Sequence, residues 1–327
     1  MKINAFGRTN LKVSGIGLGC VTFGREIDDS AAFRIMDHAF ESGITLFDTA
    51  ESYGGGEAGE YRRKVFGTED VREVSQEYHS SERIIGDWLN AKRCREKIVL
   101  QTKISSNFTV RHLTKALDAR LQRLRTDWID VYLLHSFDWS TPIDDSIEAL
   151  HRAVSAGKVR VIGCSNFSTE QLRKFVQASE SSGSTRFEVV QDNYNLVIRT
   201  IEQELIPYCM QNQIAVTTYS PLGGGFLSGK YLPMAQSVPK HSRFDVIPGH
   251  LEYYFNDKGF TVLNQLRTKS EITRVPMAQL ALAWVLHNPD LTSVLVGATA
   301  TSHIDNAMKA QRMDLPLDWI SEMDKRY

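Results

Sequence analysis

One segment of the chain, IDVYLLHSFDWSTPIDDSIEALHRAVSAGKVRVIGCSN (129–166), contains a complete β-α-β pattern. It begins with the apolar run 129–135, continues through helical periodicity at 144–157, and ends with a second apolar run at 159–166. A strand, a crossover helix and another strand in this order predict two parallel neighbouring strands. Both runs are almost entirely apolar, which is typical of a parallel sheet that is covered on both faces.

The same alternation extends along the chain in both directions. The predicted strands are 14–20, 44–50, 98–104, 129–135, 159–166, 189–195, 215–222 and 293–298. Eight strand-helix units favour closure into a barrel over an open sheet. We therefore predict an α/β fold, a (β/α)8 TIM barrel, as one domain covering residues 1–327.

Three segments fall outside this repeat. Residues 2–13 predict a small N-terminal β-hairpin that turns at GRTN. Residues 54–80 precede a predicted helix at 81–92, and their charge run, 57–77, is interpreted as a solvated loop. Residues 223–257 predict a long loop after the seventh strand. Because long loops in compact domains are usually functional, we expect both long segments at the C-terminal face, with the first shaping the substrate mouth or an oligomer contact.

Composition narrows the possible partners and compartment. The formal net charge is -1 and no basic stripe stands out, so we expect no nucleic-acid or membrane partner. The chain begins without a signal-like apolar core and has no span of about 20 apolar residues, which predicts a cytoplasmic protein. Cys20, Cys94, Cys164 and Cys209 are scattered, which favours reduced thiols over disulfides or a zinc site. The sequence leaves the oligomeric state open.

Polar residues gather at the predicted strand ends, where the active sites of such barrels lie. The candidates are Asp48 and Tyr53 after the second strand, Lys103 after the third, His135 after the fourth, Ser165 and Asn166 after the fifth, Gln191 in the sixth, and Tyr219 and Ser220 after the seventh. Because the C-terminal ends of parallel strands meet at one end of a barrel, we expect all of them at one mouth.

Four of these residues suit the reduction of a carbonyl group. The phenol of Tyr53 is a weak acid, and a neighbouring Lys103 ammonium is expected to lower its pKa, with Asp48 holding the ammonium in place. A neutral His135 can donate a hydrogen bond to the carbonyl oxygen. Metal catalysis is not expected, and no metal site is predicted, because His135 is the only histidine at a predicted strand end and Lys103 would repel a cation.

At nearly full length the chain resembles the aldo-keto reductase superfamily. The motifs that carry the resemblance, in this order and spacing, are GLGCVTFG, FDTAESYG, QTK, LLH, GKVRVIGCSNF, QDNYN and YSPLGGGFLSGKY. The resemblance implies a barrel that binds NADP or NAD without a Rossmann domain. It implies hydride transfer between the nicotinamide and a small-molecule carbonyl or alcohol substrate, such as an aldehyde, a ketone or a sugar.

The resemblance also implies a role for each matching residue. Tyr53 matches the acid/base, with Asp48, Lys103 and His135 as its partners. The positions that match those holding the cofactor are Ser165, Asn166 and Gln191 at the nicotinamide carboxamide, Tyr219 stacked on the ring, and Ser220, Leu222, Gly297, Thr299 and Asn306 around the pyrophosphate and adenosine. The loop GATATSHIDN (297–306) departs from the NADP-preferring pattern because it contains no Lys or Arg for the 2′-phosphate. We therefore expect NAD to be used as well.

Each candidate also has a structural interpretation. Asp48 and Lys103 can form a buried ion pair without catalysis, and Tyr53, His135 or Tyr219 can serve in packing. Asn166 can cap a helix that starts near residue 168. The coincidence of four compatible groups at the ends of three neighbouring strands favours the catalytic interpretation.

A different class of function is a cofactor-sensing regulatory binding module. The chain resembles the potassium-channel β subunits, which use this barrel as a regulatory partner with weak turnover. Those proteins lack the histidine at the position of His135. Its presence here favours an enzyme.

Overall fold

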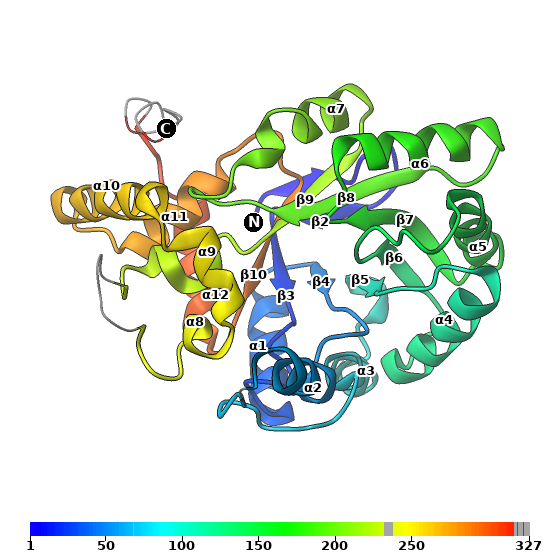
Figure 1. The fold of residues 1–327 in the computed structure, drawn as a ribbon, viewed down its shortest axis with the longest axis horizontal. Helices are drawn as coiled ribbons and strands as arrows, with labels where there is room; N and C mark the ends of the chain where they lie inside the picture. Colours follow the sequence, from blue (N-terminus) through cyan, green and yellow to red (C-terminus); the bar gives the residue numbers. More distant parts are fainter. Residues whose placement is uncertain (68, 232–237, 317–318, 320–322, 324–327) are drawn as a thin grey trace.

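The computed structural model describes residues 1–327 except 68, 232–237, 317–318, 320–322 and 324–327. A closed barrel lies at its centre (Figure 1). Its strands are β3 (Ile16–Gly19), β4 (Leu46–Asp48), β5 (Val99–Ile104), β6 (Ile129–Leu134), β7 (Val159–Ser165), β8 (Phe187–Asn193), β9 (Ala215–Tyr219) and β10 (Ser293–Gly297). Neighbouring strands pair in parallel in the order β10-β3-β4-β5-β6-β7-β8-β9. The predicted (β/α)8 barrel is confirmed; seven strands are shorter than their predicted runs, and β8 has the predicted length but begins two residues earlier.

Helices surround the barrel on its outside (Figure 1). The helices between or after successive barrel strands are α1 (Asp29–Glu41), α3 (Ser80–Lys92), α4 (Val110–Leu124), α5 (Ile143–Ser155), α6 (Thr169–Ser181), α7 (Leu205–Gln211), α11 (Met277–Leu286) and α12 (Thr301–Gln311). Side-chain caps fix where two of these helices begin. Asp28 accepts a hydrogen bond from the Ala31 amide at the start of α1, and Ser168 forms a capping box with Gln171 at the start of α6. None of the helices in the described part of the chain combines the length and the hydrophobicity that spanning a bilayer requires.

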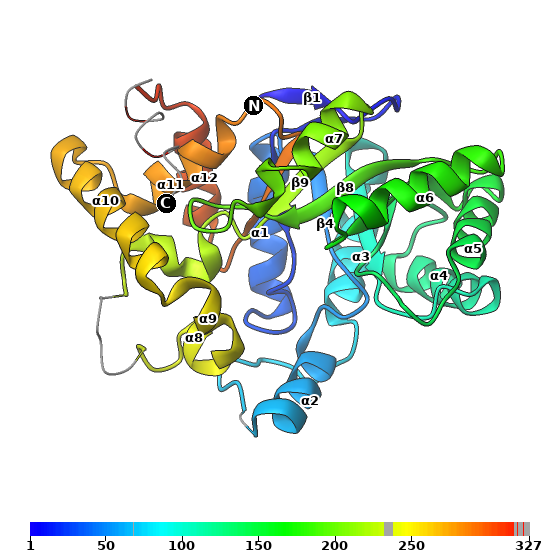
Figure 2. The ribbon, with the colours of Figure 1, turned by 45° about the horizontal axis from the view of Figure 1, so that its top comes forward.

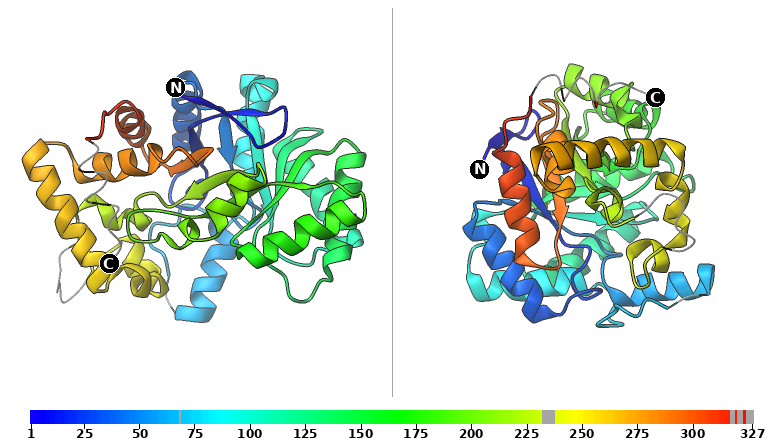
Figure 3. Two further views of the ribbon diagram at one scale, coloured as in Figure 1. Left: turned by 90° about the horizontal axis from the view of Figure 1, so that it is seen from above. Right: turned by 90° about the vertical axis from the view of Figure 1, so that its left-hand side faces the viewer.

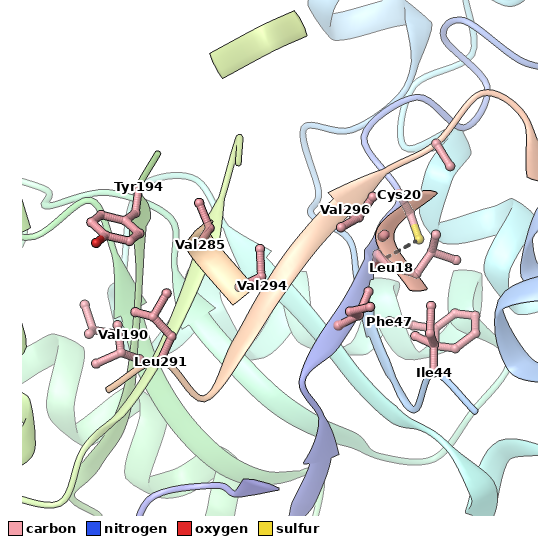
Figure 4. Close-up of a cluster of buried hydrophobic side chains, with 14 of the residues drawn as sticks. Leu18, Cys20, Ile44, Phe47, Val190, Tyr194, Val285, Leu291, Val294 and Val296 are labelled. Carbon is pink, nitrogen blue, oxygen red and sulfur yellow. Dashed lines mark hydrogen bonds between the residues drawn. The ribbon is translucent and has the colours of Figure 1, made fainter. Parts of the chain in front are cut away.

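Two hydrophobic clusters stabilise the fold. The inner cluster fills the barrel with side chains such as Leu46, Val131 and Leu295. The outer cluster joins the outward faces of the strands to the helices, and Figure 4 shows part of it, including Val294 of β10 and Phe47 of β4. Alternate residues of each strand thus serve the two clusters. All four cysteines are buried and unpaired, as expected for reduced thiols.

The predicted N-terminal hairpin is also confirmed. Strands β1 (Ile3–Ala5) and β2 (Lys12–Ser14) pair antiparallel, and Phe6 and Val13 pack against the inner cluster. The hairpin therefore closes the N-terminal end of the barrel. Helix α2 (Gly55–Phe66) lies at the opposite end of the molecule (Figure 2). That opposite end is the C-terminal face, where the candidate site residues lie.

The interpretation of 57–77 as a solvated loop is wrong in part: charged residues such as Glu60, Arg63 and Lys64 are exposed, but the segment is not simply a loop. Much of it forms α2 and an internal ion cluster in which the buried Arg62 pairs with Asp70 at 3.8 Å and with Glu73. Folding of this segment back on itself brings the carboxylates of Asp70 and Glu73 to the guanidinium group of Arg62. The start of α2 packs closely on the returning chain, because a side chain at Gly55 would overlap the Ser75 carbonyl oxygen.

The second long segment is also more ordered than the predicted loop. After β9 it forms η3 (Gly223–Ser228), α8 (Arg243–Val246), η4 (Pro248–His250) and α9 (Leu251–Tyr254), and it leads into α10 (Asp257–Thr273) at the outer edge of the molecule (Figure 3). Phe226 organises this segment, with the rings of Tyr231, Phe244, Tyr254 and Phe255 within 6.4 Å of its own. Contacts between aromatic rings therefore hold the short helical turns of this segment together. Residues 232–237 of the predicted loop lie outside the described residues.

Candidate active site

Asp48, Tyr53 and Lys103 meet at the C-terminal end of the barrel. Lys103 Nζ donates to both carboxylate oxygens of Asp48, at 2.7 and 2.8 Å, and to the Thr49 carbonyl at 2.9 Å. It also lies 3.3 Å from the Tyr53 hydroxyl. Lys103 and Asp48 are almost fully buried, with exposed fractions of 0% and 2%. The sequence placed these residues at neighbouring strand ends, and the structure brings them into one connected group.

His135 completes the predicted quartet. It follows β6 directly, and its backbone amide donates to the Ile104 carbonyl at 2.8 Å. Its ring lies edge-on to Tyr53, with 5.8 Å between the ring centres and 75° between the planes. The imidazole and the phenol therefore border the same space at the mouth.

Burial decides the direction of the pKa shift of Tyr53 and of His135, but not that of Lys103. The pKa of Tyr53 is above its ordinary value because burial raises it by more than the Lys103 ammonium lowers it. Lys103 thus lowers the pKa of Tyr53, as expected, but not by enough to bring it below the ordinary value. Burial lowers the pKa of Lys103, but Asp48 and Tyr53 outweigh that effect, so the ammonium form is favoured. Burial, followed by repulsion from Lys103 and Arg120, lowers the pKa of His135 to about 3, so the imidazole is neutral.

Two amide side chains hold the Asp48 carboxylate from inside the barrel. Gln101 donates to Asp48 Oδ1 at 2.7 Å, and Gln191 donates to the same atom at 3.1 Å. Gln191, expected at the nicotinamide carboxamide, is thus bonded to the Asp48 carboxylate. Sequence reasoning missed Gln101, although strand alternation could have found it: it lies two residues before Lys103 and therefore on the same face of β5.

Ser165, Asn166 and Tyr219 form a second connected group. The Tyr219 hydroxyl donates to Asn166 Oδ1 at 2.6 Å, and Asn166 Nδ2 donates to the His135 carbonyl at 2.9 Å and to Ser165 Oγ at 3.1 Å. Asn166 has a left-handed backbone, with φ of 58°. It is not the cap of α6, because Ser168 has that role. The capping interpretation of Asn166 is therefore wrong, and its side chain faces the mouth.

The turn after β9, which contains Ser220 and three successive glycines at 223–225, is called the glycine cradle below. Ser220 and the glycines 223, 224 and 225 all have positive φ values. Side chains at Gly224 and Gly225 would meet Arg243 Cδ at 3.2 Å and Lys230 Nζ at 3.3 Å. Leu222 anchors the turn, since its carbonyl accepts from the amides of residues 225 and 227 and its side chain packs on the outer cluster.

Arg243 and Lys230 are basic residues that sequence reasoning missed at this cradle. Burial and repulsion from Arg25 lower the pKa of Arg243 to about 10. Within the described part of the chain, no carboxylate lies at ion-pair distance from Arg243. Such a cation next to an open glycine turn suits an anionic ligand. The sequence feature that could have pointed to this pair is that Lys230 directly precedes the segment 231–242 and Arg243 directly follows it.

The remaining candidates lie at the end of β10, the strand next to β9. Gly297 is exposed at the last position of the strand, and the Thr299 amide faces His303 Nδ1 at 3.3 Å. Asn306 accepts a hydrogen bond from Gln279 of α11 at 2.9 Å. Helix α12 begins here without a side-chain cap, although the amide of its third residue, His303, donates to the Ala300 carbonyl at 3.1 Å.

A cavity of about 440 Å³ opens beside Asn166. Asp192 of β8 and the starts of α6 and α7 line it. Burial raises the pKa of Asp192 to about 6. Tyr53 and Lys103 are not among its lining residues, so it is separate from the group around the phenol.

Among the residues that the structure describes, no cluster of three or more histidine, cysteine or acidic side chains could hold a metal ion.

Comparison with known proteins identifies the family. Residues 15–327 match the model of the aldo/keto reductase family. An uncharacterized oxidoreductase, YrpG, of Bacillus subtilis is 33% identical over 96% of this chain and 92% of its own length. A probable voltage-gated potassium channel β subunit of Arabidopsis thaliana is 32% identical, with coverage of 95% and 91%. An NADH-specific methylglyoxal reductase of Escherichia coli is 28% identical, with coverage of 96% and 95%.

The chain belongs to the aldo/keto reductase family.

Proposed function

We propose that the chain is an NAD(P)H-dependent oxidoreductase that interconverts a small carbonyl compound, such as an aldehyde, a ketone or a sugar, and its alcohol. One observation carries this proposal: the Tyr53 hydroxyl lies 3.3 Å from a Lys103 ammonium that is bonded to Asp48, next to a neutral imidazole. A buried ion pair alone explains neither the phenol nor the imidazole at the same mouth. Together the four groups supply a proton and bind a developing negative charge.

The residues around the mouth fit a nicotinamide dinucleotide. Ser165, Asn166 and Tyr219 offer polar atoms and one ring face beside the quartet. The glycine cradle, with Lys230 and Arg243, offers backbone and cations to a pyrophosphate. When bound, the nicotinamide supplies or accepts the hydride. Gln191 would hold the carboxamide only after giving up or sharing its bond to Asp48.

The chain's own residues handle the proton. In reduction, the Tyr53 O–H donates its proton to the alkoxide oxygen that forms on the substrate, and the raised pKa of Tyr53 keeps that proton available at neutral pH. His135 donates an N–H to the same oxygen and orients it. Lys103 stabilises the phenolate that remains, and Asp48 fixes the ammonium. In the oxidation of an alcohol the proton moves in the opposite direction.

We further propose that the site accepts NADH as well as NADPH. The loop 297–306 offers hydroxyls and His303 but no permanent positive charge, and His303 faces the Thr299 amide. The 2′-phosphate of NADP would therefore lack the bidentate partner that arginine supplies. The E. coli relative named as NADH-specific supports this proposal.

A second candidate function is a cofactor-sensing binding module. The potassium channel β subunits among the relatives favour it, at 32% and 29% identity. His135 argues for turnover, because a neutral imidazole next to the phenol is useful for chemistry and not for sensing alone.

Two measurements test the proposal. Fluorescence titration with NADH and with NADPH gives both affinities, and the loss of absorbance at 340 nm with a panel of aldehydes, ketones and sugars gives turnover. We expect both cofactors to bind and at least one carbonyl class to be reduced. A protein that binds cofactor tightly but reduces none of the panel would support the binding module instead.

A further inference from the structure

Arg120 occupies a position in α4 where the sequence pattern calls for an apolar residue. The buried face of this helix consists of Leu113, Leu117, Arg120 and Leu124, which follow helical spacing. The exposed fraction of Arg120 is 0%. A leucine here would continue the stripe, whereas a buried guanidinium requires charged partners to offset its desolvation. Its partners therefore indicate why an arginine is present.

The partners of Arg120 belong to the segments that carry the catalytic residues. Its Nη2 atom lies 2.6 Å from Glu51 Oε2 and donates to the Lys103 carbonyl at 3.2 Å. Its Nε atom lies 3.4 Å from Glu82 Oε1 on α3. Its guanidinium also lies over the ring of Tyr132, 5.3 Å from the centroid. One side chain thus joins the loop after β4, the strand β5 and the helix α3.

The Lys103 carbonyl is the point where these links converge. It accepts the Glu51 backbone amide at 3.1 Å as well as Arg120 Nη2. Glu51 is consequently fastened to β5 through its backbone and, by way of Arg120, through its carboxylate. Tyr53 follows Glu51 by two residues, and its hydroxyl reaches Lys103 Nζ at 3.3 Å, near the upper limit for a hydrogen bond. A small shift of this loop would separate phenol from ammonium.

We propose that Arg120 is a positioning residue that fastens the loop 49–53 to β5 and so keeps the Tyr53 phenol within reach of Lys103. The inference rests on the proposed function, because it assigns Arg120 to the geometry of that acid/base. Neutralising Glu82 does not require Arg120, since Arg123 already pairs with Glu82 Oε2 at 2.7 Å. What Arg120 adds is the link to Glu51. The Nη2 atom alone reaches both the Glu51 carboxylate and the Lys103 carbonyl, so the shorter side chain of a lysine would have to bring its ammonium to the same point.

The test compares Arg120→Met, Arg120→Lys and Glu51→Gln with a matched control, Arg123→Met. The control removes a cation from the same Glu82, and the ion pairs of the described residues link Arg123 to no atom of the loop 49–53. The full chain is loaded with NADH, and single-turnover reduction of 4-nitrobenzaldehyde is followed by stopped flow. Oxidation of 4-nitrobenzyl alcohol with NAD is followed from pH 6 to 10. Thermal unfolding and NADH titration are measured for every variant.

For Arg120→Met we expect a loss of turnover of roughly 10²-fold, the effect of misplacing a reacting group by about 1 Å. Arg120→Lys and Glu51→Gln should lose less, and the KM for the aldehyde and the affinity for NADH should stay as in the parent. The oxidation profile should move to higher pH in all three variants, because a phenol that has lost its ammonium neighbour ionises less readily. Arg123→Met should leave the profile in place.

A purely structural role would lower thermal stability without moving the pH profile. That result, or a profile that moves equally in Arg123→Met, would overturn the proposal. If Arg120→Met does not fold, Glu51→Gln decides, since it keeps the size of the side chain and removes only its charge. A parent chain that turns over neither substrate would refute the proposed function and this inference together. A parent that turns over alongside variants of parental rate and profile would refute the inference alone.

Discussion

Replacing Lys103 with methionine removes the ammonium and keeps the approximate length of the side chain. The ammonium lies 3.3 Å from the Tyr53 oxygen. At an effective dielectric constant of about 20, the attraction between an ammonium and a phenolate at this separation is about 5 kcal/mol. Asp48, 2.7 Å away from Lys103 Nζ, cancels part of that attraction. We therefore expect alcohol oxidation, which starts from the phenolate, to slow by roughly 10²–10³-fold.

The same substitution leaves the Asp48 carboxylate without its cation. Breaking a buried pair by removing one partner typically costs about 3–5 kcal/mol, so the free energy of unfolding of Lys103→Met should fall by about that amount. The double variant Lys103→Met/Asp48→Asn removes both charges. It should recover most of the lost stability while the oxidation rate stays low. Stability and catalysis can thus be separated at one pair of residues.

The assay is the pH dependence of alcohol oxidation with NAD, with urea denaturation of each protein in parallel. In Lys103→Met the rise of the rate with pH should begin at a higher pH than in the parent, because the main interaction that offsets the burial of Tyr53 is then lost. A rate and a pH profile equal to those of the parent would refute the role of Lys103. Recovery of the rate in the double variant would show that the single variant was merely misfolded.

Three further perturbations give distinct expectations. Tyr53→Phe removes the proton donor, so turnover should fall by roughly 10²–10⁴-fold while NADH titration stays unchanged; undiminished reduction would remove Tyr53 from its role. Because the pKa of His135 is held at about 3, the reduction rate should show no histidine titration between pH 5 and 8. A step near pH 6.5 that disappears in His135→Gln would contradict this neutral imidazole. Asp192 has a pKa of about 6 against an ordinary 3.8, so its ionisation in the folded state opposes folding increasingly as the pH rises from about 4 to 6, and fully above that. Asp192→Asn should therefore raise the free energy of unfolding by roughly 2–3 kcal/mol at pH 8 and by little at pH 4, measured by urea denaturation; an equal effect at both would contradict it.

The barrel was predictable because its signal is local. Each strand is a short apolar run and each covering helix has its own periodicity, so the β-α repeat is visible without knowledge of tertiary contacts. The grouping of the four candidate catalytic residues was predictable for a related reason: strand ends are visible in the sequence, and the topology brings the ends of neighbouring parallel strands together. Asp48 and Lys103 follow directly from that rule.

Features that depend on burial and on long-range pairing were not predictable. The direction of the Tyr53 pKa depends on how deeply the phenol is buried, which no local pattern states. The charge run 57–77 is largely exposed as expected, but no local pattern shows that one of its members, Arg62, is buried against two carboxylates. Arg243 lies some twenty residues beyond the turn that it adjoins, in a segment without readable periodicity.

The seam of the barrel has a consequence for its biogenesis. Strand β3 has β4 on one side and β10 on the other, with Val294 opposite Ile16. During synthesis on a ribosome, one edge of β3 therefore stays unpaired until almost three hundred residues have been made. An exposed strand edge is a template for pairing with another chain. We expect nascent chains that end before β10 to be held by chaperones or to aggregate, and the final closure of the ring to be the last cooperative step.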